Sequence, residues 1–246
     1  MIKKGHHLSD IHNFIAPYIK FRGTLNKIKE KERPPLPKSL RDIDFKLPIF
    51  KQWTETVEGK QFLRYDNLNH ARRIIIYMSD YGIEWLRGAS RIHSDGTFSF
   101  CPKLFFQFYL LFGTHDKGPN AIILPCGYFL LPGKNEEVYT ELFIALKEII
   151  KPNDAPPTTP ALNPEVALTD FEAAVQNSLL DAFPDIDIKV CFFHFKHAIH
   201  DWITLHGYKV DYTTNSSFRV WVDMLSITYQ LRRVGYVICF KKLRQN

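Results

Sequence analysis

Apolar residues occur in short runs along the middle of the chain, and the period of each run predicts a strand or a helix. Residues 72–80 (RRIIIYMSD) are β-branched, and residues 91–100 (RIHSDGTFSF) alternate between polar and apolar, as strands do. Residues 103–114 (KLFFQFYLLFGT) are apolar almost throughout, which is typical of a central strand buried on both faces. Residues 121–131 continue as a strand in which Pro125 favours a bulge or an edge position. Short connections between the last three strands predict an antiparallel meander.

Helical periodicity follows this meander. Asn135 is a suitable N-cap for a helix with acids in its first turn. The predicted helices are residues 81–87, 136–150, 171–183 and 194–207. Short strands, residues 165–170 (EVALTD) and 187–195 (DIKVCFFHF), lie between the later helices. The order from residue 91 is β-β-β-α-β-α-β-α, which predicts an α/β fold with a mixed sheet flanked by helices.

Composition bounds the class of protein. The 246 residues are 45% hydrophobic and 24% charged, so we expect a packed core. The four cysteines are widely spaced and do not form a disulfide framework, and no secretory or transmembrane segment is recognisable, which favours an intracellular protein. We expect a basic, proline-containing segment or linker at 1–58, one domain at 59–229 and a basic tail at 230–246.

The net charge of +6 is unevenly distributed. Residues 1–60 hold 13 Lys/Arg and 7 Asp/Glu, which is +6. Residues 230–246 hold 5 basic residues and no acid, which is +5, so residues 61–229 carry −5. Both ends therefore favour a polyanion such as DNA, although solvated tails explain the same pattern equally well.

Asp95 and Asp170 are the candidate chemical residues. Aspartate is uncommon in the interior of a strand, so its presence at position 95 indicates a specific structural or functional role. Asp170 ends the strand 165–170, and if the two strands are neighbours the carboxylates converge. Close carboxylates repel each other unless a cation lies between them, and Mg²⁺ suits such oxygen ligands. Taken singly, each residue is more simply explained as a turn acid (Asp95) or as a helix N-cap (Asp170).

Cys191 and His194 form a C-x-x-H pair. Residues three apart on a strand point to opposite faces, so the two share a site only if the strand ends near Phe193 and a helix begins. His197 and His200 continue at helical spacing. As zinc ligands Cys191 and His194 are only half a tetrahedral set, and a buried cysteine with a helix-start histidine is the favoured alternative.

Together these motifs resemble the transposase domain of Mutator-like elements, the MULE domain. The matching segments are GKQFLRYD (59–66), RRIIIYMSD (72–80), SDGTF (94–98), PKLFFQFYLLFG (102–113), GYFLLPGKNEEVYTELFIAL (127–146), LTDFEAA (168–174), FPDIDIKVCFFHFKHAI (183–199) and SFRVWVDMLSITY (217–229). The resemblance implies the ribonuclease-H-like fold of DDE transposases. It also implies that Asp95 and Asp170 are catalytic acids that bind Mg²⁺ or Mn²⁺. Cys191 and His194 would be the family's C-x-x-H signature, which is associated with handling the DNA strands.

The resemblance further implies DNA as a partner, residence in the nucleus, and self-association. A third acid, a downstream Glu, completes the family set, yet no Glu occurs after Glu172. Asp223 lies in the predicted helix before the expected insertion and is not assigned this role. We therefore expect a transposon-derived domain that is catalytically incomplete and truncated at its C-terminus. The alternative is a domesticated module that binds DNA or protein without catalysis.

Overall fold

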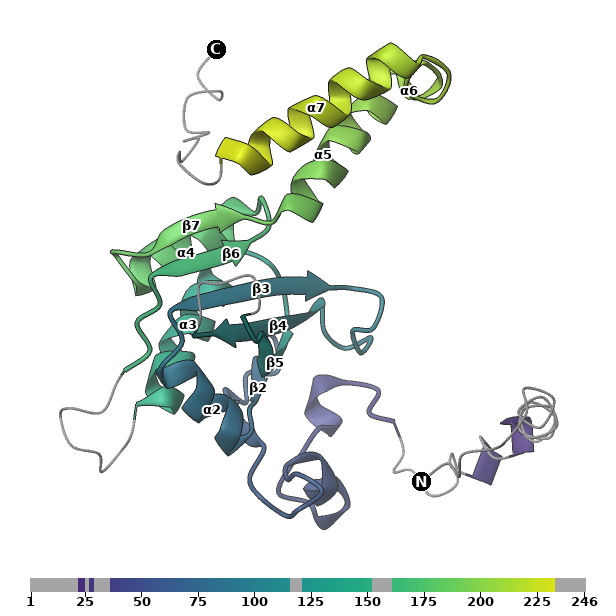
Figure 1. Ribbon diagram of the computed structural model, residues 1–246. Helices are drawn as coiled ribbons and strands as arrows, with labels where there is room; N and C mark the ends of the chain where they lie inside the picture. The colour runs from purple at the N-terminus through teal and green to yellow at the C-terminus, as the bar shows by residue number, and fades with distance from the viewer. Residues whose placement is uncertain (1–21, 25–26, 29–35, 116–120, 152–160, 233–246) are drawn as a thin grey trace, which may run out of the picture. The chain divides into compact units, whose positions relative to one another are not determined.

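A computed structural model of the chain describes residues 22–24, 27–28, 36–115, 121–151 and 161–232 (Figure 1). Most of the predicted N-terminal segment and nearly all of the predicted tail lie outside the described residues. The chain divides into two compact units, Met1–Gln52 and Trp53–Asn246. Two short 3-10 helices precede the sheet, η1 (Leu40–Asp42) and η2 (Pro48–Trp53).

The second unit is built on a seven-stranded sheet in the order β1-β2-β5-β4-β3-β6-β7. Its strands are β1 (Leu63–Asp66), β2 (Ile75–Tyr77), β3 (Arg91–Thr97), β4 (Gln107–Thr114), β5 (Leu124–Leu131), β6 (Val166–Thr169) and β7 (Asp187–Val190). Strand β4 pairs antiparallel with both β3 and β5, β6 pairs parallel with β3, and β7 pairs parallel with β6. The predicted meander and the predicted ribonuclease-H-like mixed sheet are therefore confirmed.

Helices connect the later strands and then continue beyond them. They are α2 (Asp80–Arg87), α3 (Glu136–Ile150), α4 (Ala173–Ala182), α5 (Phe192–Leu205), α6 (Lys209–Thr214) and α7 (Ser216–Arg232). The predicted N-cap is confirmed, because Asn135 Oδ1 accepts a hydrogen bond from the Val138 N–H at 3.0 Å. Helices α5, α6 and α7 pack on one another beyond the β7 edge, and we call them the helical arm (Figure 1). In the described part of the chain no helix has both the length and the apolar character needed to cross a membrane.

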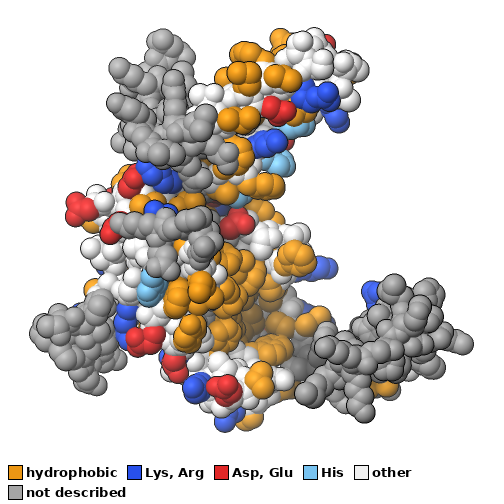
Figure 2. All heavy atoms as spheres, viewed as in Figure 1, with side chains coloured by type: hydrophobic (Ala, Val, Ile, Leu, Met, Phe, Trp, Pro, Cys, Tyr) orange, Lys and Arg blue, Asp and Glu red, His pale blue; other side chains and the backbone are white. Residues whose placement is uncertain are grey.

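The two faces of the sheet differ in burial. One face packs against α2, α3 and α4 through fully buried side chains such as Ile76, Leu111 and Phe129. Each such side chain contributes about 1.5–3 kcal/mol by leaving water. The opposite face is half-buried, so the expectation that β4 is buried on both faces is wrong. Figure 2 shows hydrophobic side chains gathered along this part of the molecule and over the helical arm.

Local hydrogen bonds explain where other predictions succeed or fail. Leu111 pairs with Gly127 and Phe112 with Pro125, so Cys126 is the extra residue of a bulge, as Pro125 predicted. The strand predicted over 187–195 instead ends at Val190. The N–H of Phe195 donates to the carbonyl of Cys191 at 3.0 Å, which begins α5 and removes residues 192–195 from the sheet.

Helix α2 packs so closely on β5 that a methyl group at Gly82 would lie 2.7 Å from the carbonyl oxygen of Cys126. Alanine is favoured over glycine in an isolated helix by about 1 kcal/mol, but this clash reverses the sign. We predict that Gly82→Ala lowers the free energy of unfolding by about 1–3 kcal/mol in urea denaturation. Gly133→Ala is the control, because its nearest neighbour would be 3.9 Å away, and it should change stability by less than about 0.5 kcal/mol. A Gly82→Ala variant as stable as the parent would contradict this packing.

Candidate active site

Asp95 lies on β3, and Asp170 directly follows β6, the parallel neighbour of β3. The register pairs Arg91 with Val166 and His93 with Leu168, a constant offset of 75 residues. Asp95 and Asp170 are also 75 residues apart, so continuing the same register by two residues places Asp170 opposite Asp95. Asp170 directly follows β6, where open α/β sheets place their ligands. The neighbouring strands on which convergence of the two carboxylates depended are thus present.

The simpler local explanations predicted a turn at Asp95 and an N-cap at Asp170, and of these only a capping-type hydrogen bond at Asp170 is present. Asp95 lies inside β3 and not in a turn. The N-cap of α4 is Glu172 and not Asp170. Alternation along β3 places Ile92, Ser94 and Gly96 on the core face and Asp95 on the opposite, accessible face. The Asp95 side chain is 54% exposed, so a ligand in solution can reach it.

The C-x-x-H pair borders both acids. The strand ends before Cys191, whose N–H donates to the carbonyl of Thr169 at 2.8 Å, directly beside Asp170. His194 lies in the first turn of α5, and its Nε2 is 3.6 Å from Oδ1 of Asp95. Both groups are partly exposed, so this contact contributes at most about 1 kcal/mol to stability. The contact matters because it places His194 of the C-x-x-H pair next to Asp95 of β3, although the two residues are far apart in the sequence.

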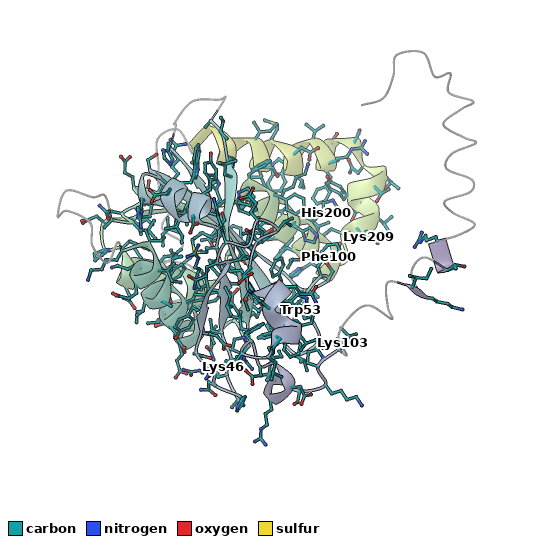
Figure 3. All side chains as sticks on the ribbon, turned by 90° about the horizontal axis from the view of Figure 1, so that it is seen from below. Lys46, Trp53, Phe100, Lys103, His200 and Lys209 are labelled. Atoms are coloured by element: carbon teal, nitrogen blue, oxygen red, sulfur yellow. The ribbon has the colours of Figure 1, made fainter. Side chains whose placement is uncertain are left out.

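The other histidines of α5 have different neighbours. His197 Nδ1 lies 3.2 Å from Asp201 Oδ2, within the same helix. The His200 ring lies 4.7 Å from the ring of Tyr212, on the helical arm (Figure 3). The three histidines at helical spacing therefore contact three different groups, and only His194 reaches Asp95.

A short hydrogen-bonded turn fixes the backbone at Asp170. Its Oδ1 accepts the N–H of Glu172 at 3.1 Å, and its carbonyl accepts Gln176 Nε2 at 2.9 Å. The Glu172 carboxylate in turn accepts the hydroxyl of Tyr139 at 3.2 Å. Burial raises the pKa of Glu172 and the charge of Asp170 raises it further, while Lys134 opposes the shift. The turn therefore holds a second carboxylate close to Asp170.

The donor atoms suit a hard cation. Two carboxylates on adjacent strands are the number that Mg²⁺ commonly takes from protein, with water and phosphate oxygens completing its shell. Within the described ranges no cluster of three or more His, Cys, Asp or Glu side chains is arranged to hold a metal ion. The carboxylate oxygens of Asp95 and Asp170 are the ligand type that a hard cation prefers.

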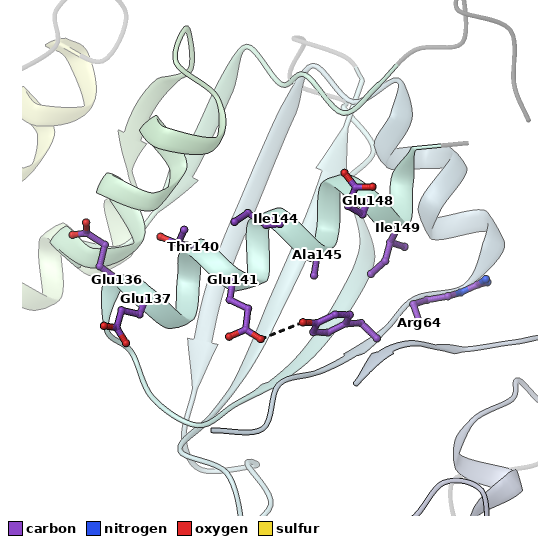
Figure 4. A pocket seen from close by; sticks show the side chains of 10 residues that line it. Arg64, Glu136, Glu137, Thr140, Glu141, Ile144, Ala145, Glu148 and Ile149 are labelled. Atoms are coloured by element: carbon purple, nitrogen blue, oxygen red, sulfur yellow. Dashed lines mark hydrogen bonds between the residues drawn. The ribbon is translucent and has the colours of Figure 1, made fainter. Parts of the chain in front are cut away.

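A cavity lies away from these residues. It is a groove of about 740 Å³ lined by Arg64, Tyr65 and one side of α3 (Figure 4). The Tyr65 hydroxyl donates to Glu141 Oε1 at 3.1 Å across it. None of the four predicted site residues lines this groove. Cavity size therefore does not identify the candidate site.

Sequence reasoning assigned no role to Glu172, Tyr139 or Gln107. Glu172 offered a signal, since it stands two residues after Asp170. Tyr139 and Gln107 offered none, because their hydrogen bonds join residues that are 26, 32 and 33 positions apart in the sequence.

Residues 91–198 match the family model of the MULE transposase domain. The match runs from β3 into α5 and includes Asp95, Asp170, Cys191 and His194. No curated protein matches the chain significantly. The earlier resemblance extended over 59–229, so its outer segments lie beyond the matched residues.

The turn at Asp170 generates a stability prediction. Asp170→Asn keeps an oxygen that accepts the Glu172 N–H and removes the repulsion between two carboxylates, so its free energy of unfolding should equal or exceed that of the parent. Asp170→Ala leaves that N–H without its acceptor and should cost about 1 kcal/mol. Urea denaturation in the presence of a chelator measures both. An Asn variant as unstable as the Ala variant would contradict the proposed hydrogen bond.

Proposed function

We propose that residues 91–198, which match the family model of the MULE transposase domain, act as a transposon-derived DNA transposase domain. Asp95 and Asp170 are, in this proposal, the metal-binding acids with which the domain acts on DNA. The observation that carries this proposal is the shared offset of 75 residues between the β3–β6 register and the two acids. The family implies dependence on a divalent metal in general. The finer proposal is that Mg²⁺ or Mn²⁺ binds between these carboxylates.

Each residue has a distinct role in this proposal. Asp95 and Asp170 supply the oxygen ligands, and the Glu172 N–H orients one oxygen of Asp170. His194 borders Asp95 and orients that carboxylate from the side of the helical arm. A divalent cation, when bound, supplies charge neutralisation and water activation for phosphodiester cleavage.

Catalytic incompleteness remains part of the proposal. The family resemblance implies a third acid, and residues 173–246 contain no glutamate. We therefore propose that Asp95 and Asp170 bind a cation, that the domain binds DNA, and that these two acids are only part of the catalytic set of three acids. A DNA substrate implies action in the nucleus, and self-association is also proposed by analogy with the family.

Charge distribution supports a second candidate, a binding module that contacts DNA without metal. The ends of the chain carry +6 and +5, whereas residues 61–229 carry −5. Basic ends attract the phosphate backbone by themselves, but an anionic middle needs a cation before phosphate can approach it. Metal dependence of DNA binding therefore separates the two candidates.

Metal binding at the acids should raise the melting temperature of the chain. A ligand present at 100 times its Kd stabilises the folded state by about 2.7 kcal/mol. We expect Mn²⁺ to raise the melting temperature of the parent but not that of Asp95→Asn or Asp170→Asn, in differential scanning calorimetry. Asp181→Asn, an exposed acid on α4, is the matched control and should respond like the parent. An equal rise in melting temperature in all four proteins would contradict the assignment of the metal site to Asp95 and Asp170.

DNA binding should depend on both salt and metal. We expect the logarithm of the binding constant to fall linearly with the logarithm of salt concentration, as counterions are released. Added Mn²⁺ should strengthen binding of the parent several-fold and leave Asp95→Asn unchanged, in fluorescence anisotropy with a labelled duplex. The same affinity with and without Mn²⁺ would favour the binding module instead.

A further inference from the structure

A line of buried polar groups runs behind the two acids, on the core face of the sheet. Gln107 begins β4 and is 1% exposed. Its Nε2 donates to the carbonyl of Gly133 at 3.0 Å and to the hydroxyl of Tyr139 at 2.9 Å. Both protons of the amide are thereby used, which a buried amide requires. Gln107 is therefore held in one orientation.

The hydroxyl of Tyr139 connects Gln107 to the turn at Asp170 through hydrogen bonds. Tyr139 is 1% exposed, and its single proton is free to donate because Gln107 already donates to its oxygen. That proton goes to Oε2 of Glu172 at 3.2 Å. The backbone N–H of Glu172 then donates to Oδ1 of Asp170 at 3.1 Å. The polar line thus ends on one of the two proposed metal ligands.

Gln107, at the other end of this series of hydrogen bonds, lies on the core face of the sheet next to Gly96, the residue after Asp95. A methyl group at Gly96 would be 2.6 Å from Oε1 of Gln107, so the residue after Asp95 leaves room for this amide only because it is glycine. Tyr109 lies next to it and faces the hydroxyls of Ser94 and Thr169, the residues that precede the two acids. Burial raises the pKa of Tyr109 well above its ordinary value, so this hydroxyl stays neutral. Ser94, Gly96 and Thr169, the neighbours of the acids within the two strands, are thus polar or glycine.

The choice of a carboxylate at position 172 is costly for folding. Glu172 lies in the same turn as Asp170, and a glutamine there would accept the hydrogen bond from Tyr139 without placing a second negative charge in that turn. Costly polar groups of this kind are common where they orient functional residues.

We propose that Gln107, Tyr139 and Glu172 form a positioning network that holds Asp170 in register with Asp95. The network acts through the hydrogen bond accepted at position 172, and none of its members touches the cation or the DNA. This inference rests on the proposed function for its consequence, which is metal affinity, but its structural part can be tested without metal.

The first measurement is amide hydrogen exchange of the full chain in chelator. Tyr139→Phe keeps the ring and removes the hydroxyl that orients Glu172. We expect exchange in residues 168–176 to accelerate about 5-fold, the factor expected for one lost hydrogen bond. Tyr65→Phe is the matched control, because Tyr65 also donates to a glutamate, Glu141, at 3.1 Å on the other side of α3. It should leave residues 168–176 unchanged. Unchanged exchange in Tyr139→Phe would overturn the network.

The second measurement is Mn²⁺ affinity, from the electron paramagnetic resonance signal of free Mn²⁺. Loss of a residue that supports a metal ligand typically weakens affinity 10- to 100-fold, and we expect about 10-fold for Tyr139→Phe and Glu172→Ala. Glu172→Gln retains the acceptor and should restore affinity to within about 3-fold of the parent. Glutamine as damaging as alanine would overturn positioning and indicate a direct role for the charge.

The two measurements separate the inference from the proposed function. If exchange accelerates in Tyr139→Phe while the parent binds no Mn²⁺, the network holds Asp170 and the proposed metal site fails. If exchange is unchanged while Mn²⁺ binds through Asp95 and Asp170, the metal site stands and the network fails.

Discussion

The parallel pairing of β3 with β6 is the constraint on which the candidate site depends. These strands are far apart in the sequence, and β4, β5 and α3 lie between them. β6 has only four residues, so its pairing is supported by the packing of α3 and α4 on the core face of the sheet. A slip of one residue would move Asp170 away from Asp95 and reverse the face of every side chain on β6. Core packing therefore determines where the two acids lie.

Alternation along the strand gives neighbouring residues opposite tasks. In the segment Ser94–Asp95–Gly96, the acid faces the accessible side while the serine and the glycine face the core. The same division holds at Thr169, which is buried and precedes Asp170. The two acids and the buried polar residues that pack beneath them are thus consecutive in the sequence. A buried polar layer of this kind is favourable only when its groups are satisfied, which is why Gln107, Tyr139 and Glu172 matter together.

Most of the fold could be predicted from the sequence because local signals agreed with the final structure. Asn135 predicted a helix start, Pro125 predicted a bulge or an edge position, of which the bulge is present, and the order of strands and helices predicted a mixed sheet. The end of β7 could not be predicted in this way, because residues 192–195 are aromatic and look like strand, whereas hydrogen bonds from Cys191 and Phe195 turn the chain into α5. The contact of His194 with Asp95 follows from that turn. The Gln107–Tyr139–Glu172 line depends on tertiary contacts that no local pattern encodes.

The most direct test of the account is to locate bound Mn²⁺ by paramagnetic broadening of nuclear magnetic resonance signals from the full chain. Broadening is strongest in residues nearest the ion, so it distinguishes the candidate site from the glutamate-lined groove on α3. The account predicts that the signals of Asp95, Asp170 and His194 broaden together at the lowest Mn²⁺ concentration. Broadening centred on Glu137, Glu141 and Glu148 instead would contradict it and place the cation in the groove.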